Sequence, residues 1–230
     1  MKTTKLLLGL MLIVFLAKAQ ENPKKCGTTP LMEYEMKTNP QYKNIVDNYF
    51  NGLEEWLKNN YKNIETFVIP LDNIFKDFQI ALSNFNSLHG FANSRARLRM
   101  ATLYQIAQSN NGLVVGTGNK VEDFGVGFYT KYGDGGVDIS PIGDCNKTEI
   151  WEMGGELGII KQIIDAVPTD GLWDDARSDE NQLGLSYEQI EAAMSNSNSK
   201  YYKKYLKIRE PNLHKIKPIP VCKIKKNVKQ

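Results

Sequence analysis

The glycine-rich stretch from residue 111 to residue 143 constrains the fold more than any other part of this sequence. It contains nine of the chain's 18 glycines and includes a short apolar run, Leu113-Val114-Val115. Glycine costs order on folding unless a turn needs a positive φ angle or a ligand must approach the main chain. A buried strand that runs into such a turn is how open α/β sheets hold ligands. The stretch therefore predicts a strand followed by a ligand-binding turn, with a loop-rich connection as the alternative.

Charged side chains of both signs lie among these glycines. They are Glu122, Asp123, Lys131, Asp134 and Asp138. A site for phosphate groups and a metal ion needs both kinds of charge, so the pattern favours a ligand site over a plain connection.

Periodic patterns before this stretch indicate a parallel α/β layer. Apolar residues repeat at helical spacing over 46–57, and a β-rich run over 64–69 stops at Pro70, which predicts a buried strand. Asp72 can cap a following helix whose apolar face is Ile74, Phe75, Phe78 and Leu82. The order helix, strand, helix is typical of an α/β fold.

Three arginines, Arg95, Arg97 and Arg99, lie at the start of a helix predicted from about residue 93 or 94 to residue 108. The dipole at a helix start favours anions over cations, so this clustering is explained if a phosphate or carboxylate is held there. The alternative is that their stems cover apolar surface at the edge of the buried face.

Four helical patterns follow the glycine-rich stretch. Asn146 can cap a helix with Glu149 at capping-box distance, and residues 159–166 look helical. An acidic loop over 170–179 leads to the amphipathic SYEQIEAAM, and a last helix is predicted over 200–209.

The N-terminal residues differ in character from the rest. Residues 1–19 are typical of a secretory signal peptide, because Lys2 and Lys5 precede an eleven-residue apolar core and the A-x-A site at 17–19. The core is too short to span a bilayer, which needs about 20 residues. Residues 20–45 form a polar leader of unknown origin, and residues 46–230 form the predicted domain.

Composition argues against several other classes of protein. Three cysteines leave at least one free thiol, and with two histidines in the chain a zinc cluster is not expected. Residues 199–230 hold eleven Lys or Arg against one acid, but aromatic residues do not continue among them after Tyr205. We therefore expect no nucleic-acid partner and no stable membrane span.

The motif GTGNKVEDFGVGFYTKYGDGGVDISPIGDCNKTEIW resembles the signature of ammonia-dependent NAD synthetases of the ATP pyrophosphatase type. The resemblance continues through residues 93–99, PTDGLWDD, SDENQLGLSYEQIE and His214-Lys215, and it covers roughly residues 50–230. It implies an α/β fold with a Rossmann-like parallel sheet flanked by helices, of the adenine nucleotide alpha hydrolase type and truncated at its N-terminus. It also implies ATP-dependent amidation of deamido-NAD with ammonia, a magnesium ion, a homodimer and a cytoplasmic location, whereas residues 1–19 indicate export.

The resemblance also assigns residues to ligands. Deamido-NAD contacts match Arg97, Lys131, Asp138, His214 and Lys215. ATP contacts match Thr117, Lys147 and Thr169, and the magnesium ligand matches Glu122. One residue is inserted between Glu122 and Lys131 relative to commoner members, which shifts the register of the helix there.

The family's pyrophosphate-binding motif, SGGxDS, does not occur in the 230 residues. In the family its backbone N–H groups cradle the pyrophosphate and its aspartate is a second ligand of the magnesium ion. We therefore expect adenylation by this chain alone to fail, and we expect unpaired strand edges to impair its folding as a monomer. Three hypotheses follow: a truncated synthetase core, a secreted nucleotide-binding protein without catalysis, and an inert chimeric fragment.

Overall fold

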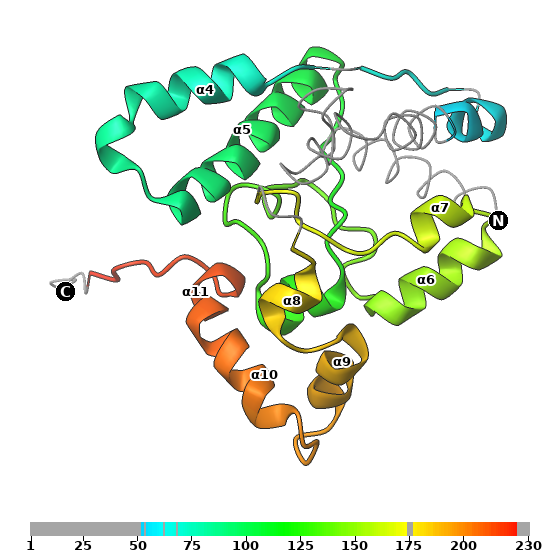
Figure 1. Cartoon of the computed structure of the whole chain (residues 1–230), viewed down its shortest axis with the longest axis vertical. Coiled ribbons are helices and arrows are strands. Elements are labelled where there is room, and N and C mark those ends of the chain that lie inside the picture. The colour runs from blue at the N-terminus through cyan, green and yellow to red at the C-terminus, as the bar shows by residue number, and fades with distance from the viewer. Residues whose placement is uncertain (1–51, 53, 62, 68, 174–176, 225–230) are drawn as a thin grey trace, which may run out of the picture.

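A computed structural model describes residues 52, 54–61, 63–67, 69–173 and 177–224. Over these residues it consists mainly of helices joined by long loops (Figure 1). The predicted signal peptide at 1–19 and the polar leader at 20–45 lie outside the described residues. The same holds for the start of the helical pattern over 46–57, whose later residues, 54–60, are helical as predicted.

The helices are named as in Figure 1. The α-helices are α4 (Asp72–Ala81), α5 (Leu88–Ser109), α6 (Lys147–Glu156), α7 (Lys161–Ile164), α8 (Asp179–Leu183), α9 (Tyr187–Ser195), α10 (Tyr202–Arg209) and α11 (Leu213–Ile216). A π-helix, η2 (Lys120–Val126), lies in the glycine-rich stretch, and short 3-10 helices cover Ser83–Phe85 and Glu210–Asn212.

The strand predicted at residues 113–115 pairs in parallel with residues near Ile139. Val115 and Ile139 form one bridge, and the Gly116 N–H donates to the Ile139 carbonyl at 2.7 Å. Val114 and Val115 are buried, as a core strand requires. This bridge is the sole β-pairing among the residues that the structure describes, so the larger parallel sheet stays a prediction.

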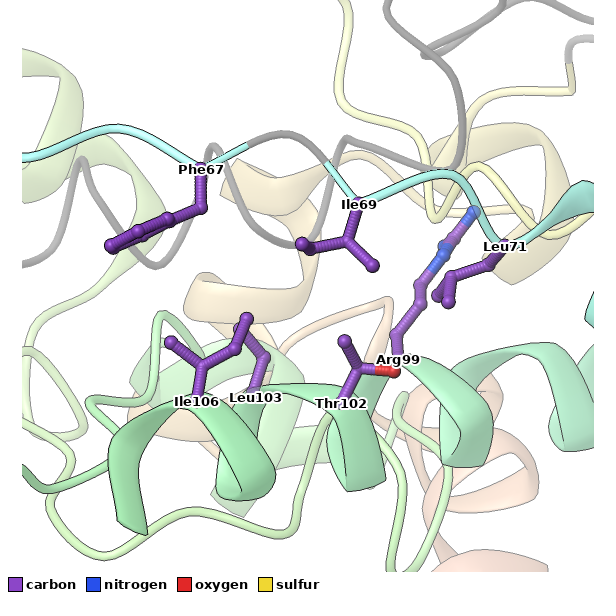
Figure 2. Close-up of a pocket in the computed structure, with 7 residues that line it drawn as sticks. All are labelled: Phe67, Ile69, Leu71, Arg99, Thr102, Leu103 and Ile106. Atoms are coloured by element: carbon purple, nitrogen blue, oxygen red, sulfur yellow. The ribbon is translucent and has the colours of Figure 1, made fainter. Parts of the chain in front are cut away.

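The prediction of a buried strand over 64–69 is wrong for the residues of that run that are described. They are extended without a strand partner, and Phe67 and Ile69 are 45% and 38% exposed. A strand must pair its N–H and C=O groups with a neighbouring strand, and the described part of the chain places none there. The run instead forms one wall of a shallow apolar groove over α5, lined by Phe67, Ile69, Leu71, Arg99, Thr102, Leu103 and Ile106 (Figure 2).

Helix α5 begins earlier than predicted. Its cap is Ser87, whose hydroxyl accepts a hydrogen bond from the Gly90 N–H at 3.2 Å. The three arginines therefore lie in the third and fourth turns of α5, beyond the first turn, where the dipole acts. The interpretation that the arginines cluster because they lie at the start of the helix is therefore wrong.

Helix α4 also differs from its prediction. Asp72 is the first helical residue, and Leu71 occupies the cap without a side-chain hydrogen bond. Phe75 is buried as predicted, but Ile74 and Phe78 are exposed because α4 packs mainly on α5.

The later helices follow their predictions more closely. Asn146 and Glu149 form the predicted capping box of α6, and the pattern over 200–209 forms α10. The run over 159–166 contains the short α7, and the loop predicted over 170–179 ends where Asp179 begins α8.

The larger apolar core lies where η2, α8, α9 and α10 meet (Figure 1). Its buried members are Val121, Val126, Leu183, Leu185, Tyr187, Ile190, Ala193 and Tyr205. A smaller cluster joins Leu57 to Ile159. Of the helices that lie in the described ranges, none combines the length and the apolar character that crossing a bilayer requires.

Candidate functional site

The π-helix η2 is fixed at both ends by local contacts. At its start, the buried Asn119 side chain accepts the Glu122 N–H at 3.0 Å. At its end, Gly127 adopts φ 68°, a left-handed conformation that glycine takes without strain. A π-helix is wider than an α-helix and often marks a functional site. The Glu122 carboxylate is thereby presented from a rigid first turn.

Glu122 forms a mostly buried ion pair with Lys147, the first residue of α6. Lys147 Nζ lies 3.0 Å from Glu122 Oε1, and the two side chains are 19% and 16% exposed. The Tyr187 hydroxyl lies 2.7 Å from the same oxygen. Two of the residues predicted for the ATP and magnesium site are thus in direct contact.

The electrostatics around Glu122 keep its carboxylate charged. Burial alone would raise the pKa of Glu122, but the Lys147 ammonium and hydrogen bonds from Tyr187 outweigh it and lower the pKa. Asp179, on the far side of the Tyr187 hydroxyl, behaves in the opposite way. Burial, followed by the charge of Glu122, raises the pKa of Asp179 to about 6.

The other two predicted ATP residues lie in nearby loops. Thr117 follows the bridged Val115 after one residue, Gly116. Thr169 is engaged within its own loop, where its hydroxyl donates to the Arg177 carbonyl at 3.2 Å and accepts the Gly171 N–H at 3.3 Å.

The basic residues predicted for deamido-NAD form a chain of contacts. Arg97 Nε donates to the Lys131 carbonyl at 3.3 Å, and Lys131 Nζ donates to the His214 carbonyl at 2.8 Å. Lys215 Nζ donates to the carbonyls of Gly127 and Tyr129 at 2.9 Å and 2.7 Å. Burial lowers the pKa of Lys215, with a smaller opposing effect from Asp134. Four of the five predicted residues therefore gather around the end of η2 and the loop that follows.

The fifth residue, Asp138, lies at the parallel pairing. One carboxylate oxygen accepts the Val114 N–H at 2.8 Å, and the other accepts the Tyr104 hydroxyl at 3.2 Å. In this arrangement Asp138 ties the strand residues to α5.

Arg95 and Arg99 hold a loop. Arg95 Nη1 donates to the Leu172 carbonyl at 2.7 Å and its guanidinium lies over the Phe75 ring, while Arg99 donates to the Gly171 carbonyl at 3.2 Å. Phe75 and this loop therefore cover the Arg95 side chain.

Sequence reasoning missed Tyr187 and Asp179 as site residues. Both lie within the SDENQLGLSYEQIE motif, but their types and spacing resemble an ordinary helix start. The Trp151 ring packs edge-on against Tyr187, with centroids 5.9 Å apart. These contacts join segments that are distant in the sequence, and local patterns carry no signal for them.

The fit of a magnesium ion depends on the donors present. Glu122 offers one carboxylate, and the described residues contain no cluster of three or more Asp, Glu, His or Cys that could hold a metal. Magnesium is commonly bound by one or two carboxylates together with substrate phosphates. The site therefore fits a magnesium ion that arrives with nucleotide phosphates.

Comparison with known proteins identifies the family. The family model described as NAD synthase matches residues 55–228. The NH(3)-dependent NAD(+) synthetase of Methanococcoides burtonii is 42% identical over 133 residues, which are 57% of this chain and 50% of the relative. The same enzyme of Carboxydothermus hydrogenoformans is 40% identical over 136 residues, which are 57% of this chain and 55% of the relative. The chain thus spans about half the length of these curated relatives.

Two solved structures are similar in fold. NMN synthetase from Francisella tularensis has a TM-score of 0.69 and 30% identity, covering 81% of this chain and 74% of that one. The NH3-dependent NAD synthetase from Campylobacter jejuni, in complex with the nitrate ion, has a TM-score of 0.57 and 25% identity, covering 78% of this chain and 72% of that one.

Proposed function

Because the chain belongs to the NAD synthase family, we propose that it carries a nucleotide site for the ammonia-dependent amidation of deamido-NAD. A nicotinate carboxylate oxygen attacks the α-phosphorus of ATP, and pyrophosphate leaves. Ammonia then attacks the activated carbonyl carbon, AMP leaves with the electrons of the C–O bond, and a proton passes to water. No side chain is covalently modified, so the protein contributes position and charge.

The Lys147–Glu122 pair carries the proposal. Removing two charges from water costs about as much as their attraction returns, so a mostly buried ion pair is weakly explained by stability alone. In the proposed site, the Lys147 ammonium binds ATP phosphates and Glu122 binds magnesium, while Thr117 and Thr169 complete the ATP set. Magnesium supplies neutralisation of the phosphate charge.

The second part of the proposed site binds deamido-NAD. Arg97, Lys131 and Lys215 provide positive charge around the end of η2, with His214 beside them, which suits the two phosphates of a dinucleotide. Asp138 contributes through the strand pairing that it holds. The homodimer and the Rossmann-like parallel sheet belong to the same proposal, supported by the family and by the parallel bridge at Val115.

A smaller nucleotide is the second candidate substrate. One of the two similar structures is an NMN synthetase, which supports nicotinate mononucleotide as an alternative to deamido-NAD. The chemistry at the carboxylate is the same for both. The two substrates differ in whether a second phosphate and an adenosine must be held.

The lack of an SGGxDS motif in the sequence suggests that binding and turnover separate in this chain. Loss of one transition-state donor commonly costs about 10²–10³ in rate, so loss of a whole phosphate nest should stop adenylation. The lack of the motif therefore favours a protein that binds nucleotides without catalysing the reaction.

Calorimetric titrations and an assay for AMP release test the proposal. We expect the 230-residue protein to bind ATP with magnesium, and either deamido-NAD or nicotinate mononucleotide, without forming AMP. Lys147→Met should weaken ATP binding about tenfold or more, because a charge-assisted contact is lost.

Lys161→Met is the matched control. Lys161 pairs with Asp165 at 3.9 Å, but these side chains are 85% and 60% exposed, so ATP affinity should not change. AMP formed in step with NAD would show that another segment replaces the motif. A folded protein that binds none of these nucleotides would contradict the proposed function.

A further inference from the structure

The Tyr187 hydroxyl lies between two carboxyl groups that come from different helices. It is 2.7 Å from Glu122 Oε1 on η2 and 3.0 Å from Asp179 Oδ2 on α8. Tyr187 is fully buried and Asp179 is 6% exposed. The other carboxyl oxygen of Asp179, Oδ1, is buried without a hydrogen-bond partner in the described part of the chain.

A tyrosine hydroxyl has one proton to donate, so the two carboxyl groups cannot both receive it. Glu122 is the nearer acceptor, because its contact is 2.7 Å and that of Asp179 is 3.0 Å. The hydroxyl proton is therefore directed to Glu122 Oε1. Asp179 lies on the other side of the hydroxyl, with Oδ2 3.0 Å from the Tyr187 oxygen.

The ring of Tyr187 has little freedom to move. It is packed in the core formed by η2, α8, α9 and α10, with Trp151 edge-on against it. Its own N–H donates to Glu180 Oε1 at 3.0 Å, which fixes the main chain at the start of α9. A hydroxyl in such a core costs free energy unless it is hydrogen-bonded. Phenylalanine would fill the same space without that cost.

We infer that Tyr187, supported by Asp179, is a positioning residue that holds the Glu122 carboxylate in place for a divalent cation. The inference rests on the proposed function, in which Glu122 is the cation ligand. Tyr187 and Lys147 both contact Oε1, and the Asn119 side chain also contributes a hydrogen bond to the carboxylate. We assign the cation to Oε2, which Tyr187 and Lys147 do not contact. Loss of a group that orients a metal ligand typically weakens metal affinity about 10–100-fold.

The test uses Mn²⁺ as the probe in the presence of ATP, because the site fits a cation that arrives with nucleotide phosphates. Electron paramagnetic resonance separates Mn²⁺ bound to the full chain from the free Mn²⁺–ATP complex. We expect Tyr187→Phe to weaken Mn²⁺ binding about tenfold or more. Tyr205→Phe is the matched control, because Tyr205 lies in the same core and its hydroxyl donates to the Gly125 carbonyl at 3.2 Å. Tyr205→Phe also removes a tyrosine hydroxyl from this core. We therefore expect it to lower the Tm by a similar amount and to leave the Mn²⁺ affinity unchanged.

Asp179→Asn provides a second variant that keeps the size of the side chain and can donate a hydrogen bond to the Tyr187 oxygen. We expect its Mn²⁺ affinity to stay within about twofold of the unmodified protein, because the Tyr187 proton still reaches Glu122. If Asp179→Asn lost as much Mn²⁺ affinity as Tyr187→Phe, Asp179 would not act on Glu122 only through Tyr187, and the inference would be contradicted.

The outcomes separate this inference from the proposed function. If the unmodified protein binds Mn²⁺ and Tyr187→Phe binds it equally well, the inference is wrong and the proposed function stands. If the folded, unmodified protein binds no Mn²⁺, the cation role of Glu122 is wrong, and the inference is overturned with it. Equal loss of affinity in Tyr187→Phe and Tyr205→Phe would show that the hydroxyl serves packing alone.

Discussion

Asp179 is a single residue whose surroundings make the stability of the protein depend on pH. Its pKa is raised from 3.8 to about 6, first by burial and then by the negative charges of Glu122 and Asp170. Hydrogen bonding to Tyr187 and the charge of Lys147 act in the opposite direction and are outweighed. The folded state therefore binds the Asp179 proton more tightly than the unfolded chain does.

The sign of the pH dependence follows from this difference. The contribution of Asp179 to the free energy of unfolding is fully present below pH 3.8 and is lost as the pH rises through about 6. The shift corresponds to a loss on the order of 3 kcal/mol. Asp179→Asn cannot ionise, so it should be more stable than the unmodified protein at pH 7 but not at pH 4.

Urea denaturation of both proteins between pH 4 and pH 7.5 measures this effect. The difference in the free energy of unfolding isolates Asp179, because other titrating groups contribute to both proteins. A difference that stays constant across this range would contradict the prediction.

At the scale of elements, helix α9 shows how a local motif fixes the start of a helix that supports the site. The Ser186 hydroxyl accepts the Gln189 N–H at 3.3 Å, and the Gln189 side chain accepts the Ser186 N–H at 3.2 Å. Ser186→Ala removes one half of this box and should lower the free energy of unfolding by about 1 kcal/mol. Ser195→Ala is the control, because Ser195 lies at the other end of α9, is exposed, and its hydroxyl donates to the carbonyls of Glu191 and Ala192 within the same helix.

Thermal unfolding followed by circular dichroism compares the two variants. We expect a lower Tm for Ser186→Ala and an unchanged Tm for Ser195→Ala. Equal Tm values would show that packing of Tyr187 and Ile190 alone determines where α9 starts.

Elements with short-range signals could be predicted from the sequence. The helix with Asn146 and Glu149 at capping-box distance and the amphipathic SYEQIEAAM segment are confirmed, because their signals span a few neighbouring residues. The start of α5 at Ser87 was missed, since Gly90 lies inside the first turn and hides the helical pattern. The run over 64–69 has strand-like composition, but composition cannot supply the neighbour that a strand needs.

The candidate site also has a part that could be predicted from the sequence and a part that could not. Its charged residues could be found from the glycine-rich stretch and the family motifs. The contact of Tyr187 with Glu122 spans 65 positions in the sequence. This contact depends on the packing of α9 against η2. Tertiary packing between distant segments produces no repeating pattern in the sequence from which it could be predicted.

At the scale of the whole molecule, the last described helices are tied to the glycine-rich stretch. The Tyr205 hydroxyl and the Arg209 guanidinium donate to the Gly125 carbonyl, and Lys215 donates to the Gly127 and Tyr129 carbonyls. The Gly125 carbonyl lies in the last turn of η2, where a helical partner is missing, and the Gly127 and Tyr129 carbonyls lie in the loop that follows. The C-terminal side chains replace those partners.

Lys215→Met should therefore destabilise the protein more than a surface change does. It leaves two carbonyls without their donor, at a cost of about 1–3 kcal/mol. Lys217→Met, two residues further along, alters an exposed lysine and should be nearly neutral. Hydrogen exchange provides the measurement: amides of residues 124–129 should exchange faster in Lys215→Met and at the original rate in Lys217→Met.

The edge-on contact between Trp151 and Tyr187 has a practical consequence. The chain has three tryptophans, and Trp56 and Trp173 lie in other surroundings, beside Gly158 and Arg177. Replacing these two by phenylalanine leaves a single fluorophore against the ring that contacts Glu122. The emission spectrum of Trp151 then becomes an optical signal of events at the carboxylate, and stopped-flow fluorescence can follow them in real time without an added dye.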